Sequence, residues 1–360
     1  MRSLTVVLAA HNEAPVVRRV LAAIERLEYP PERLHVVAVD DGSTDGTGDL
    51  LERWAARHPR AKVVRLDQRE GKSGALNAAL GVAPATELVA VCDADQELHP
   101  DSLRLVVPSF ADETVGAAGA FLRPVNANAS MVARYAAIEA WVTQLVTSAA
   151  RSRLDLNPPM LGGGSVYRRR ALDQVGGFSS GLAGEDARVS IALTRNGWRT
   201  RFVRDAVVDN RVVEHWRHYW DQHVRWARTG YETINLQRSG GRVPLGRRLE
   251  AWMVSAGYSD RVVLLAAIGL SAVDALPLWV PLAYLGMIVA TVVVAIMRGG
   301  AIWRLPLYLF ATAVLLPLDV AATVASGAQQ LSRRPLHWRT PRPPGGEGPI
   351  DPRSPSSNDR

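Results

Sequence analysis

Short apolar runs rich in β-branched residues alternate with helical patterns from Met1 to about Arg104. The runs that predict strands are Leu4 to Ala10, His35 to Asp40, Lys62 to Leu66 and Leu88 to Cys92. Strands and helices in regular alternation build a sheet that is covered by helices, and parallel strands join only through such crossovers. The alternation therefore predicts an α/β fold with a doubly wound, parallel sheet in this part of the chain.

Polar residues follow three of these four runs. They are His11-Asn12-Glu13, Asp41 to Asp45, and Asp93-Ala94-Asp95. In open α/β sheets, ligands bind beyond the carboxyl ends of the strands. The sequence thus places a binding site at that edge. The section from about Val115 to Asn235, with a glycine turn at Gly162 to Gly164, is interpreted as the second half of the same domain.

Carboxylates dominate the two sharper motifs at this edge. Asp40 and Asp41, followed by Gly42, could hydrogen-bond a uracil imide or a ribose hydroxyl, although an Asx turn that caps the next helix explains them equally well. Asp93 and Asp95 lie two positions apart after an apolar strand and could converge on one hard cation that also takes diphosphate oxygens. An Asp-x-Asp pair is also common by chance.

Two further motifs lie at predicted helix starts. Lys72, in Gly71-Lys72-Ser73-Gly74, could contact phosphate with help from the helix dipole. The alternative is an ordinary loop. Glu185-Asp186 opens an apolar helical run, where Asp186 could accept a proton from an attacking hydroxyl. Helix capping is the competing explanation.

An aromatic and basic helix is predicted from His215 to about Leu236. Within it, Arg225 could clamp a diphosphate and Trp226 could stack on a sugar. The tryptophans of this helix could equally be core residues or membrane anchors.

Apolar stretches dominate the C-terminal part, at Val262 to Met297 and at Leu305 to Ala325. About 20 apolar residues cross a bilayer, so the first stretch could hold two short spans that meet near Pro277, and the expected count is two or three. The N-terminus lacks the pattern of a signal peptide, which predicts a cytoplasmic N-terminal part. The net charge of +7 suits phosphorylated substrates, nucleic acid or an anionic membrane.

These motifs occur in one order, and in that order the sequence resembles family 2 glycosyltransferases, in particular the membrane-bound branch similar to cellulose synthases and ceramide glucosyltransferases. The resemblance covers roughly Leu4 to Arg342. It implies a GT-A fold, which is a Rossmann-like mixed sheet with helices on both faces, followed by transmembrane helices. The expected divisions are a catalytic domain (1–242), an interfacial segment (243–260), a transmembrane region (261–327) and a cytoplasmic, largely disordered tail (328–360).

The resemblance also implies residue roles. Asp41 matches the nucleoside-binding aspartate, with Glu13 and Asp40 beside the uridine. Asp93 and Asp95 match the metal and diphosphate motif. Asp186, preceded by Glu185, matches the general base. The residues that match the Gln-x-x-Arg-Trp motif near the diphosphate and the acceptor entrance are Gln222, Arg225 and Trp226, and those that match a cytoplasmic Trp-x-x-Thr-x-Arg element are Trp338, Thr340 and Arg342.

The function that the resemblance implies is an inverting hexosyltransferase of the plasma membrane. It is expected to be multi-pass, to face the cytoplasm, to use a UDP-sugar with Mg²⁺ or Mn²⁺, and to act on a polysaccharide or a lipid rather than on nucleic acid. A homo-oligomer or a partner in envelope assembly is compatible with the sequence. Two alternatives stay open: a catalytically silent nucleotide-sugar binding subunit, and a nucleotidyltransferase.

Overall fold

A mixed sheet forms the centre of the N-terminal part of the protein. The computed structural model describes residues 1–179, 184–238 and 260–331. In the described residues the sheet has eight strands in the order β3-β2-β1-β4-β7-β6-β8-β5. The strands are β1 (Leu4–Ala10), β2 (Leu34–Asp40), β3 (Ala61–Arg65), β4 (Leu88–Asp93), β5 (Glu97–Leu98), β6 (Val115–Pro124), β7 (Ser165–Arg168) and β8 (Arg199–Asn210).

The four predicted strands are confirmed, with ends that differ by no more than one residue. β1, β2, β3 and β4 pair in parallel, as their helical crossovers require. β7 then pairs antiparallel with both β4 and β6, and this makes the whole sheet mixed. The parallel interpretation therefore holds for the first half of the sheet, and the mixed GT-A sheet implied by the resemblance describes the whole.

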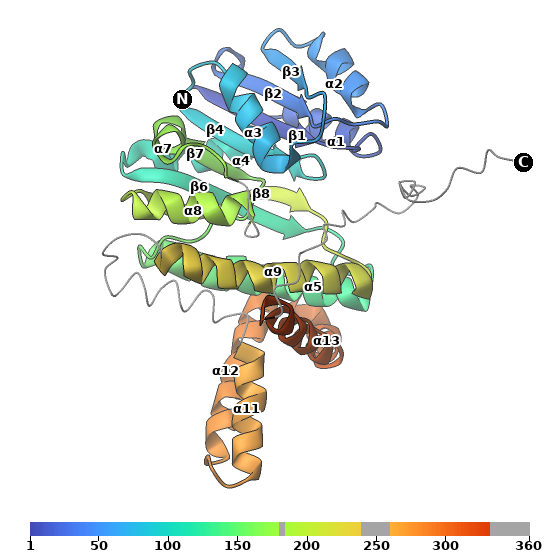
Figure 1. Ribbon diagram of the computed structural model, residues 1–360, viewed down its shortest axis with the longest axis vertical. Helices are drawn as coiled ribbons and strands as arrows, with labels where there is room; N and C mark the ends of the chain where they lie inside the picture. The colour runs from blue at the N-terminus through green and yellow to red at the C-terminus, as the bar shows by residue number, and fades with distance from the viewer. Residues whose placement is uncertain (180–183, 239–259, 332–360) are drawn as a thin grey trace, which may run out of the picture.

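Helices cover both faces of the sheet (Figure 1). One face carries α1 (Val17–Glu25), α2 (Thr47–Ala55) and α4 (Ser102–Val106), and the other carries α3 (Gly71–Val82), α7 (Arg169–Val175) and α8 (Glu185–Arg195). Side chains alternate along β1, so that Val6 packs on the first face and Val7 on the second. Burial on both faces explains why these strands are continuous apolar runs.

A further layer of helices lies below the sheet in Figure 1. It contains α5 (Met131–Trp141), a π-helical segment (Val142–Ser148), α6 (Ala149–Arg153) and α9 (Trp216–Arg238). Ser130 caps α5 by accepting a hydrogen bond from the Ala133 amide. The buried Gln144 side chain bonds both backbone groups of Leu122 and so fixes this layer to β6.

Three apolar helices complete the described chain: α11 (Asp260–Ala272), α12 (Trp279–Arg298) and α13 (Leu305–Leu331). The first apolar stretch is broken between Ala272 and Trp279, close to the predicted break at Pro277. Two helical segments, Trp279–Arg298 and Ile302–Gln329, are long and apolar enough to cross a membrane. The predicted interfacial segment (Leu245 to Tyr258), the Trp338 element and most of the tail lie outside the described residues.

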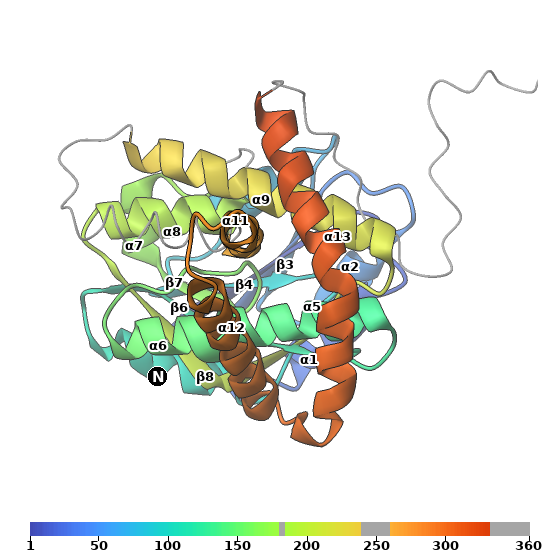
Figure 2. The same cartoon turned by 90° about the horizontal axis from the view of Figure 1, so that it is seen from below.

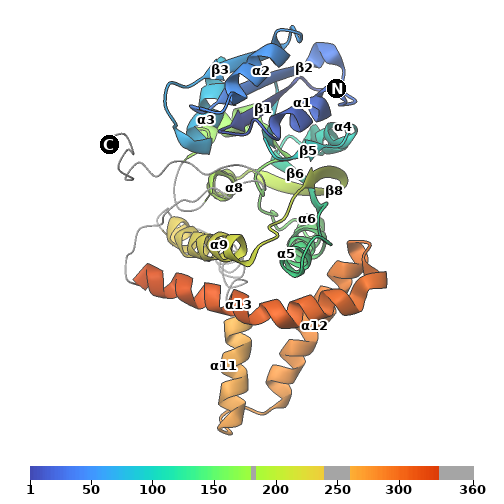
Figure 3. The same ribbon diagram turned by 90° about the vertical axis from the view of Figure 1, so that its right-hand side faces the viewer.

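The apolar helices differ in direction. α11 and α12 form a hairpin that projects away from the sheet (Figure 3), whereas α13 runs beneath α9 and α5. From below, α11 is seen nearly end-on and α13 lies across the view (Figure 2). One face of α13 packs inward through Tyr308, Ala311, Leu315, Asp319 and Ala322, and the opposite face is apolar and exposed, as at Phe310 and Val324.

Candidate functional site

The register of the sheet brings the predicted acidic motifs together. At the ends of the strands, Ala10 of β1 pairs with Asp40, and its neighbour Ala9 pairs with Asp93. β7 runs in the opposite direction, so the glycine turn before it meets the end of β4, where the Gly164 amide bonds the Val91 carbonyl at 2.9 Å. Acidic side chains and the backbone of a buried glycine turn thus share one edge of the sheet.

Lys72 joins two of the predicted motifs. Its ammonium lies 2.6 Å from Oδ1 of Asp93 and 2.8 Å from Oε1 of Glu185. Burial alone would lower the pKa of Lys72, but the two carboxylates outweigh burial and raise it. The first turn of α3 is therefore tied to the end of β4 and to the start of α8. An ordinary exposed loop does not explain this arrangement.

Asp186 lies beside this cluster, in the first turn of α8. The helix is capped at Gly184 without a side-chain bond, so Asp186 is not the N-cap residue. Burial and the charge of Glu185 raise the pKa of Asp186 to about 6, while Lys72 acts in the opposite direction. A carboxylate with such a pKa is well suited to accept a proton near neutral pH.

Gly162 brings its backbone into the centre of the cluster. A Cβ atom added to Gly162 would lie 3.5 Å from Oδ2 of Asp93, 3.5 Å from Nζ of Lys72 and 3.7 Å from Oδ2 of Asp186. Its φ of 86° also favours glycine. Three motifs that are far apart in the sequence therefore surround one point.

Gln96 is a site residue that the sequence interpretation missed. A Cβ atom on Gly163 would collide with Oε1 of Gln96 and would lie 3.0 Å from Oδ2 of Asp93. Oε1 is buried and has no hydrogen-bond partner among the described residues, while Nε2 donates to Asn210 at 3.2 Å. The position of Gln96 directly after the Asp-x-Asp pair is the only signal for it in the sequence.

Negative charge accumulates at this edge. Burial and then the charges of Asp95 and Asp45 raise the pKa of Glu13 to about 7. Desolvation and the charge of Asp93 raise the pKa of Asp95. Such excess charge, on hard oxygen ligands, fits a divalent cation, and Mg²⁺ commonly takes one or two protein carboxylates and completes its shell with phosphate and water.

Asp40 and Asp41 have structural partners. Oδ1 of Asp40 accepts the Ser43 amide at 3.1 Å, but α2 is capped at Gly46 without a side-chain bond, so neither aspartate caps that helix. Oδ1 and Oδ2 of Asp41 accept the amides of Glu70 at 2.7 Å and Gly71 at 2.9 Å. Asp41 thereby fixes the loop that precedes Lys72. The nucleoside-binding roles of both aspartates stay predictions.

The predicted motif on α9 lies one layer further from the sheet. α8 contacts α9, so Asp186 and the motif lie on neighbouring helices (Figure 1). Gln222 and Arg225 are partly exposed, and Trp226 is 36% exposed. Trp226 packs against the ring of His223 with 5.1 Å between ring centroids. The motif is thus close to α8, which carries Asp186, but is separate from the Lys72 cluster.

A second polar cluster lies where α5, α9 and α13 meet. The metal-ligating atoms of Glu139, His223 and Asp319 lie within 4.8 Å of one another, and no other group of three such residues in the described chain is as compact. Asp93 and Asp95 belong to no such group among the described residues. No sequence motif indicates this cluster, because its members come from three distant helices.

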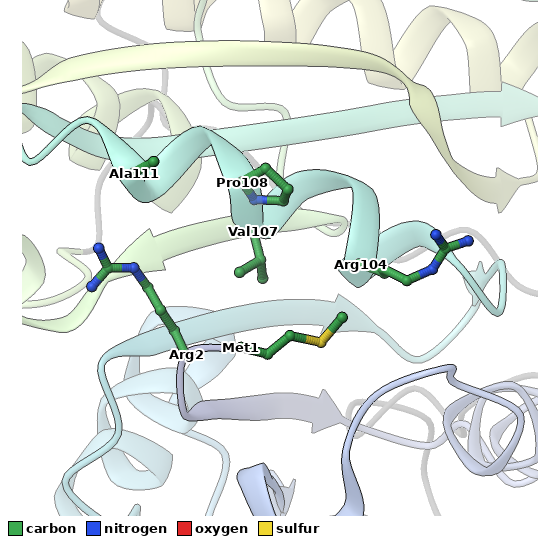
Figure 4. A pocket seen from close by; sticks show the side chains of 6 residues that line it. All are labelled: Met1, Arg2, Arg104, Val107, Pro108 and Ala111. Atoms are coloured by element: carbon green, nitrogen blue, oxygen red, sulfur yellow. The ribbon is translucent and has the colours of Figure 1, made fainter.

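Two surface hollows lie away from these motifs. One, of about 460 Å³, is lined by Met1, Arg2, Arg104, Val107, Pro108 and Ala111 (Figure 4). It adjoins the amino end of β1, whereas the acidic motifs follow the carboxyl ends. Arg2 is also held there by Glu87 and Glu113. A second hollow, lined by α1 and α2 residues, contains no predicted site residue either.

Comparison with known proteins gives one consistent result. The family described as "Glycosyltransferase like family 2" matches residues 2–229. A probable glycosyltransferase, YdaM, from Bacillus subtilis is 30% identical over 62% of this chain and 54% of its own length. The β-monoglucosyldiacylglycerol synthase of Synechocystis is 33% identical over 62% of this chain and 47% of its own length. The chain spans about half the length of these relatives.

A solved structure supports the fold. A mannosyltransferase from Pyrobaculum calidifontis, in complex with GDP-mannose and Mn²⁺, superposes with a TM-score of 0.67 at 26% identity. The match covers 93% of this chain and 88% of that one. The GT-A architecture implied by the resemblance is thereby confirmed.

Proposed function

Because the chain belongs to glycosyltransferase family 2, we propose that it transfers a sugar from a nucleoside diphosphate to a hydroxyl of a membrane lipid. One observation carries the proposal: Asp93, Lys72 and Asp186 converge on the backbone of Gly162. In this proposal Asp93 is a ligand of the cation, Lys72 binds phosphate, and Asp186, whose pKa is raised to about 6, is the base. A transferase needs these groups together where a diphosphate leaves and a hydroxyl attacks.

The proposed reaction is a single displacement with inversion. Asp186 takes the proton of the acceptor hydroxyl, the acceptor oxygen forms a bond to the anomeric carbon, and the bond from that carbon to the diphosphate oxygen breaks with its electron pair. When the donor binds, the ammonium of Lys72 would exchange its carboxylate partners for oxygens of the diphosphate. Gly162 adds no side chain beside Asp93, Lys72 and Asp186, and the missing side chain of Gly163 leaves room for Gln96 next to Asp93.

Asp95, with Asp93, would hold the Mg²⁺ or Mn²⁺ ion. When bound, that ion supplies positive charge that stabilises the leaving diphosphate. Burial and the neighbouring carboxylates raise the pKa of Glu13 to about 7, and this crowding of acids at one edge supports the assignment. The mannosyltransferase that shares the fold was solved in complex with GDP-mannose and Mn²⁺, which further supports a divalent ion here.

The donor is proposed to carry uridine, with Asp41, Asp40 and Glu13 near the base and ribose. Support comes from their place at the ends of β1 and β2, next to the groups proposed to bind the diphosphate. The mannosyltransferase of similar fold is in complex with GDP-mannose, so a panel of donors should compare GDP-sugars with UDP-sugars.

A lipid acceptor is favoured by the position of the apolar helices. α12 and α13 share a core with α5, through residues such as Ile138, Trp141, Ile296 and Tyr308. An acceptor that leaves the bilayer would therefore meet α9 and then Asp186. The diacylglycerol-glucosylating activity in the name of the Synechocystis relative is consistent with this route.

The α11–α12 hairpin is proposed to enter the bilayer while α13 lies along its surface. The catalytic part packs along one face of α13, so a membrane-crossing α13 would carry the charged helices α5 and α9 into hydrocarbon. Unpaired polar and charged groups there are costly. The exposed apolar face of α13, including Leu307, Phe310 and Val324, suits the interface instead.

Transfer of label from nucleotide sugars by the full chain in lipid discs tests the function. We expect Mn²⁺-dependent product that extracts into organic solvent, together with one nucleoside diphosphate for each sugar transferred. Label that stays in an ethanol-insoluble, glycosidase-sensitive polymer would replace the lipid acceptor with a polysaccharide.

The same assay separates the two other functions. A nucleotidyltransferase would release pyrophosphate from a nucleoside triphosphate. A silent binding subunit would bind donor without turnover in every donor and acceptor combination. Either result would overturn the proposed transfer.

A further inference from the structure

A cluster of charged side chains is buried where the catalytic part meets the apolar helices, away from the sheet edge. We call it the buried charge network. It consists of Glu139 from α5, His223 from α9, Arg261 from α11 and Asp319 from α13, with the hydroxyls of Tyr135 and Tyr219. The side chains of His223 and Asp319 are 6% and 3% exposed.

Glu139 is the centre of the network. Its Oε2 lies 2.9 Å from Nε2 of His223, and the Tyr219 hydroxyl donates to the same carboxylate at 3.1 and 3.2 Å. Nη2 of Arg261 lies 3.5 Å from Oε1. Glu139 of α5 thus contacts α9 and α11 directly, and it is connected to α13 through Arg261.

Asp319 completes the network from α13. Nη1 of Arg261 lies 2.7 Å from its Oδ2, and the Tyr135 hydroxyl donates to the same oxygen at 3.2 Å. Arg261 therefore bridges Asp319 to Glu139. The apolar helices are joined to the catalytic part by ion pairs as well as by apolar packing.

The hydrogen bonds show that His223 is protonated. Nδ1 lies 2.9 Å from the Tyr219 carbonyl, which can only accept, and Nε2 faces the Glu139 carboxylate, which also accepts. Both ring nitrogens therefore donate. Among the described residues, the imidazolium and the guanidinium balance the two carboxylates, so these four side chains together carry no net charge.

This protonation argues against a metal ion in the network. A metal would need a free lone pair on His223, but both nitrogens are used as donors. Arg261 already lies against both carboxylates. The compactness of the cluster is explained by the ion pairs.

His223 connects the network to the motif on α9. Its ring stacks on Tyr219 with 3.6 Å between centroids and contacts Trp226 at 5.1 Å. Gln222, Arg225 and Trp226 lie within one helical turn of His223. Any rotation of α9 that broke the His223–Glu139 bond would also move these three residues.

We propose that the buried charge network is a positioning device that sets the rotation of α9 on the apolar helices and so orients Trp226 and Arg225 toward the incoming acceptor. The inference rests on the proposed function. Buried ion pairs add little net stability compared with apolar packing, but they can fix one arrangement among several. The four charged residues of the network act through α9, and none is assigned to the reacting atoms.

Substitution of Arg261 in the full chain, in lipid discs, tests the proposal. We expect R261M to lower kcat/KM for the acceptor by roughly tenfold, since small misplacements of orienting groups have effects of this size or larger. The dissociation constant of the donor with Mn²⁺ should stay within about twofold, because the Lys72 cluster is untouched. R261K keeps the charge and should restore most of the activity.

D274N is the matched control. Asp274 is an exposed carboxylate between α11 and α12, outside the network, and Asn tolerates its φ of 55°. Its activity should equal that of the wild type. If R261M does not fold, Y135F removes only the hydroxyl that bonds Asp319 and should show the same acceptor-specific loss at smaller size.

Three results would overturn the proposal. One is unchanged acceptor kinetics in folded R261M and Y135F. Another is a parallel loss of donor binding and transfer, which would indicate a general structural role. The third is a stoichiometric metal ion that is present in the wild type and lost in D319N. If transfer itself is not detected in the wild type, the proposed function fails first, and that outcome is distinct from all three.

Discussion

The two polar clusters of this protein are built in opposite ways. At the sheet edge, Lys72 contacts Asp93 and Glu185, while Glu13 and Asp95 add further acids whose pKa values are raised by burial and by neighbouring carboxylates. In the buried charge network, Glu139 and Asp319 are each bonded to cationic and hydroxyl donors. One cluster has an excess of charge and the other is balanced.

The difference distinguishes the sheet edge, which is suited to bind a ligand, from the buried charge network, which joins helices to one another. Excess carboxylates reduce the stability of the folded chain unless a cation or another partner neutralises them, so natural sites of this kind usually serve a ligand. A balanced network needs no ligand. The compact grouping of Glu139, His223 and Asp319 looks more like a metal site by distance alone, but the hydrogen-bond directions reverse that conclusion.

The largest expected effect is that of D186N at the sheet edge. Loss of the general base should lower kcat by roughly 10²- to 10⁴-fold. Stability should stay the same or rise slightly, because one of several crowded carboxylates loses its charge. Transfer assays and denaturant unfolding measure the two effects.

D319N provides the contrast in the network. It should lower the free energy of unfolding by roughly 3 kcal/mol, because Arg261 and Tyr135 lose a charged partner. The contrast between the two clusters would fail if D186N were the more destabilising substitution.

Gly163 offers a steric test of the sheet edge. G163A would place a methyl group against Gln96 and Asp93, and we expect stability to fall by about 1–3 kcal/mol and transfer by about tenfold. G81A is the control, since a Cβ there meets nothing within 4 Å and lies in α3. Its stability should be unchanged or up to about 1 kcal/mol higher. Equal behaviour of the two variants would show that the space beside Gly163 is not required.

The pH dependence of kcat should report Asp186. The base must be ionised to accept a proton, and its pKa is raised to about 6, so activity should be lost as pH falls through about 6 and be retained above it. The pKa of Glu13 is raised to about 7, so its titration could change donor binding in the same pH range. Donor binding is therefore measured at each pH to separate that effect from the effect of Asp186 on kcat. A kcat that persists well into the acidic range would remove Asp186 from the mechanism.

The smallest effect concerns the membrane helices. Cys92 is the single cysteine and is buried, so V273C and V324C can each carry one fluorescent label. Both positions are exposed, at 71% and 56%. We expect the label at residue 324 to be quenched by lipids that carry a quencher near the headgroups. The label at residue 273 should be quenched by lipids that carry the quencher at a different depth in the bilayer. Equal depth at both positions would contradict a surface-lying α13.

Much of the catalytic half can be predicted from local sequence. The four strands and the polar residues after them follow from apolar runs that are buried on both faces and from the position of ligand sites at strand ends. The break between α11 and α12 follows from Pro277, which lies between Ala272 and Trp279. These features depend on a few neighbouring residues.

Features that depend on distant segments cannot be predicted in this way. Gln96 is placed in the site by the packing of Gly163, from the turn before another strand. The partner of Glu139 is set by the contact of α5 with α9. Arg261 follows Asp260 at the edge of an apolar run and Asp319 lies within another, and neither position indicates that the two side chains meet. The backbone partners of Asp41 likewise become clear only when α3 is placed beside β2.

Calorimetric titration of nucleotide sugar into the full chain, with and without Mn²⁺, tests the central claim most directly. We expect Mn²⁺-dependent binding that is lost in a D93N/D95N variant and kept in D319N. Donor binding that is unchanged in D93N/D95N would contradict the assignment of the charged edge as the donor site. Donor binding that is lost equally in D319N would contradict the assignment of the balanced network as a structural joint.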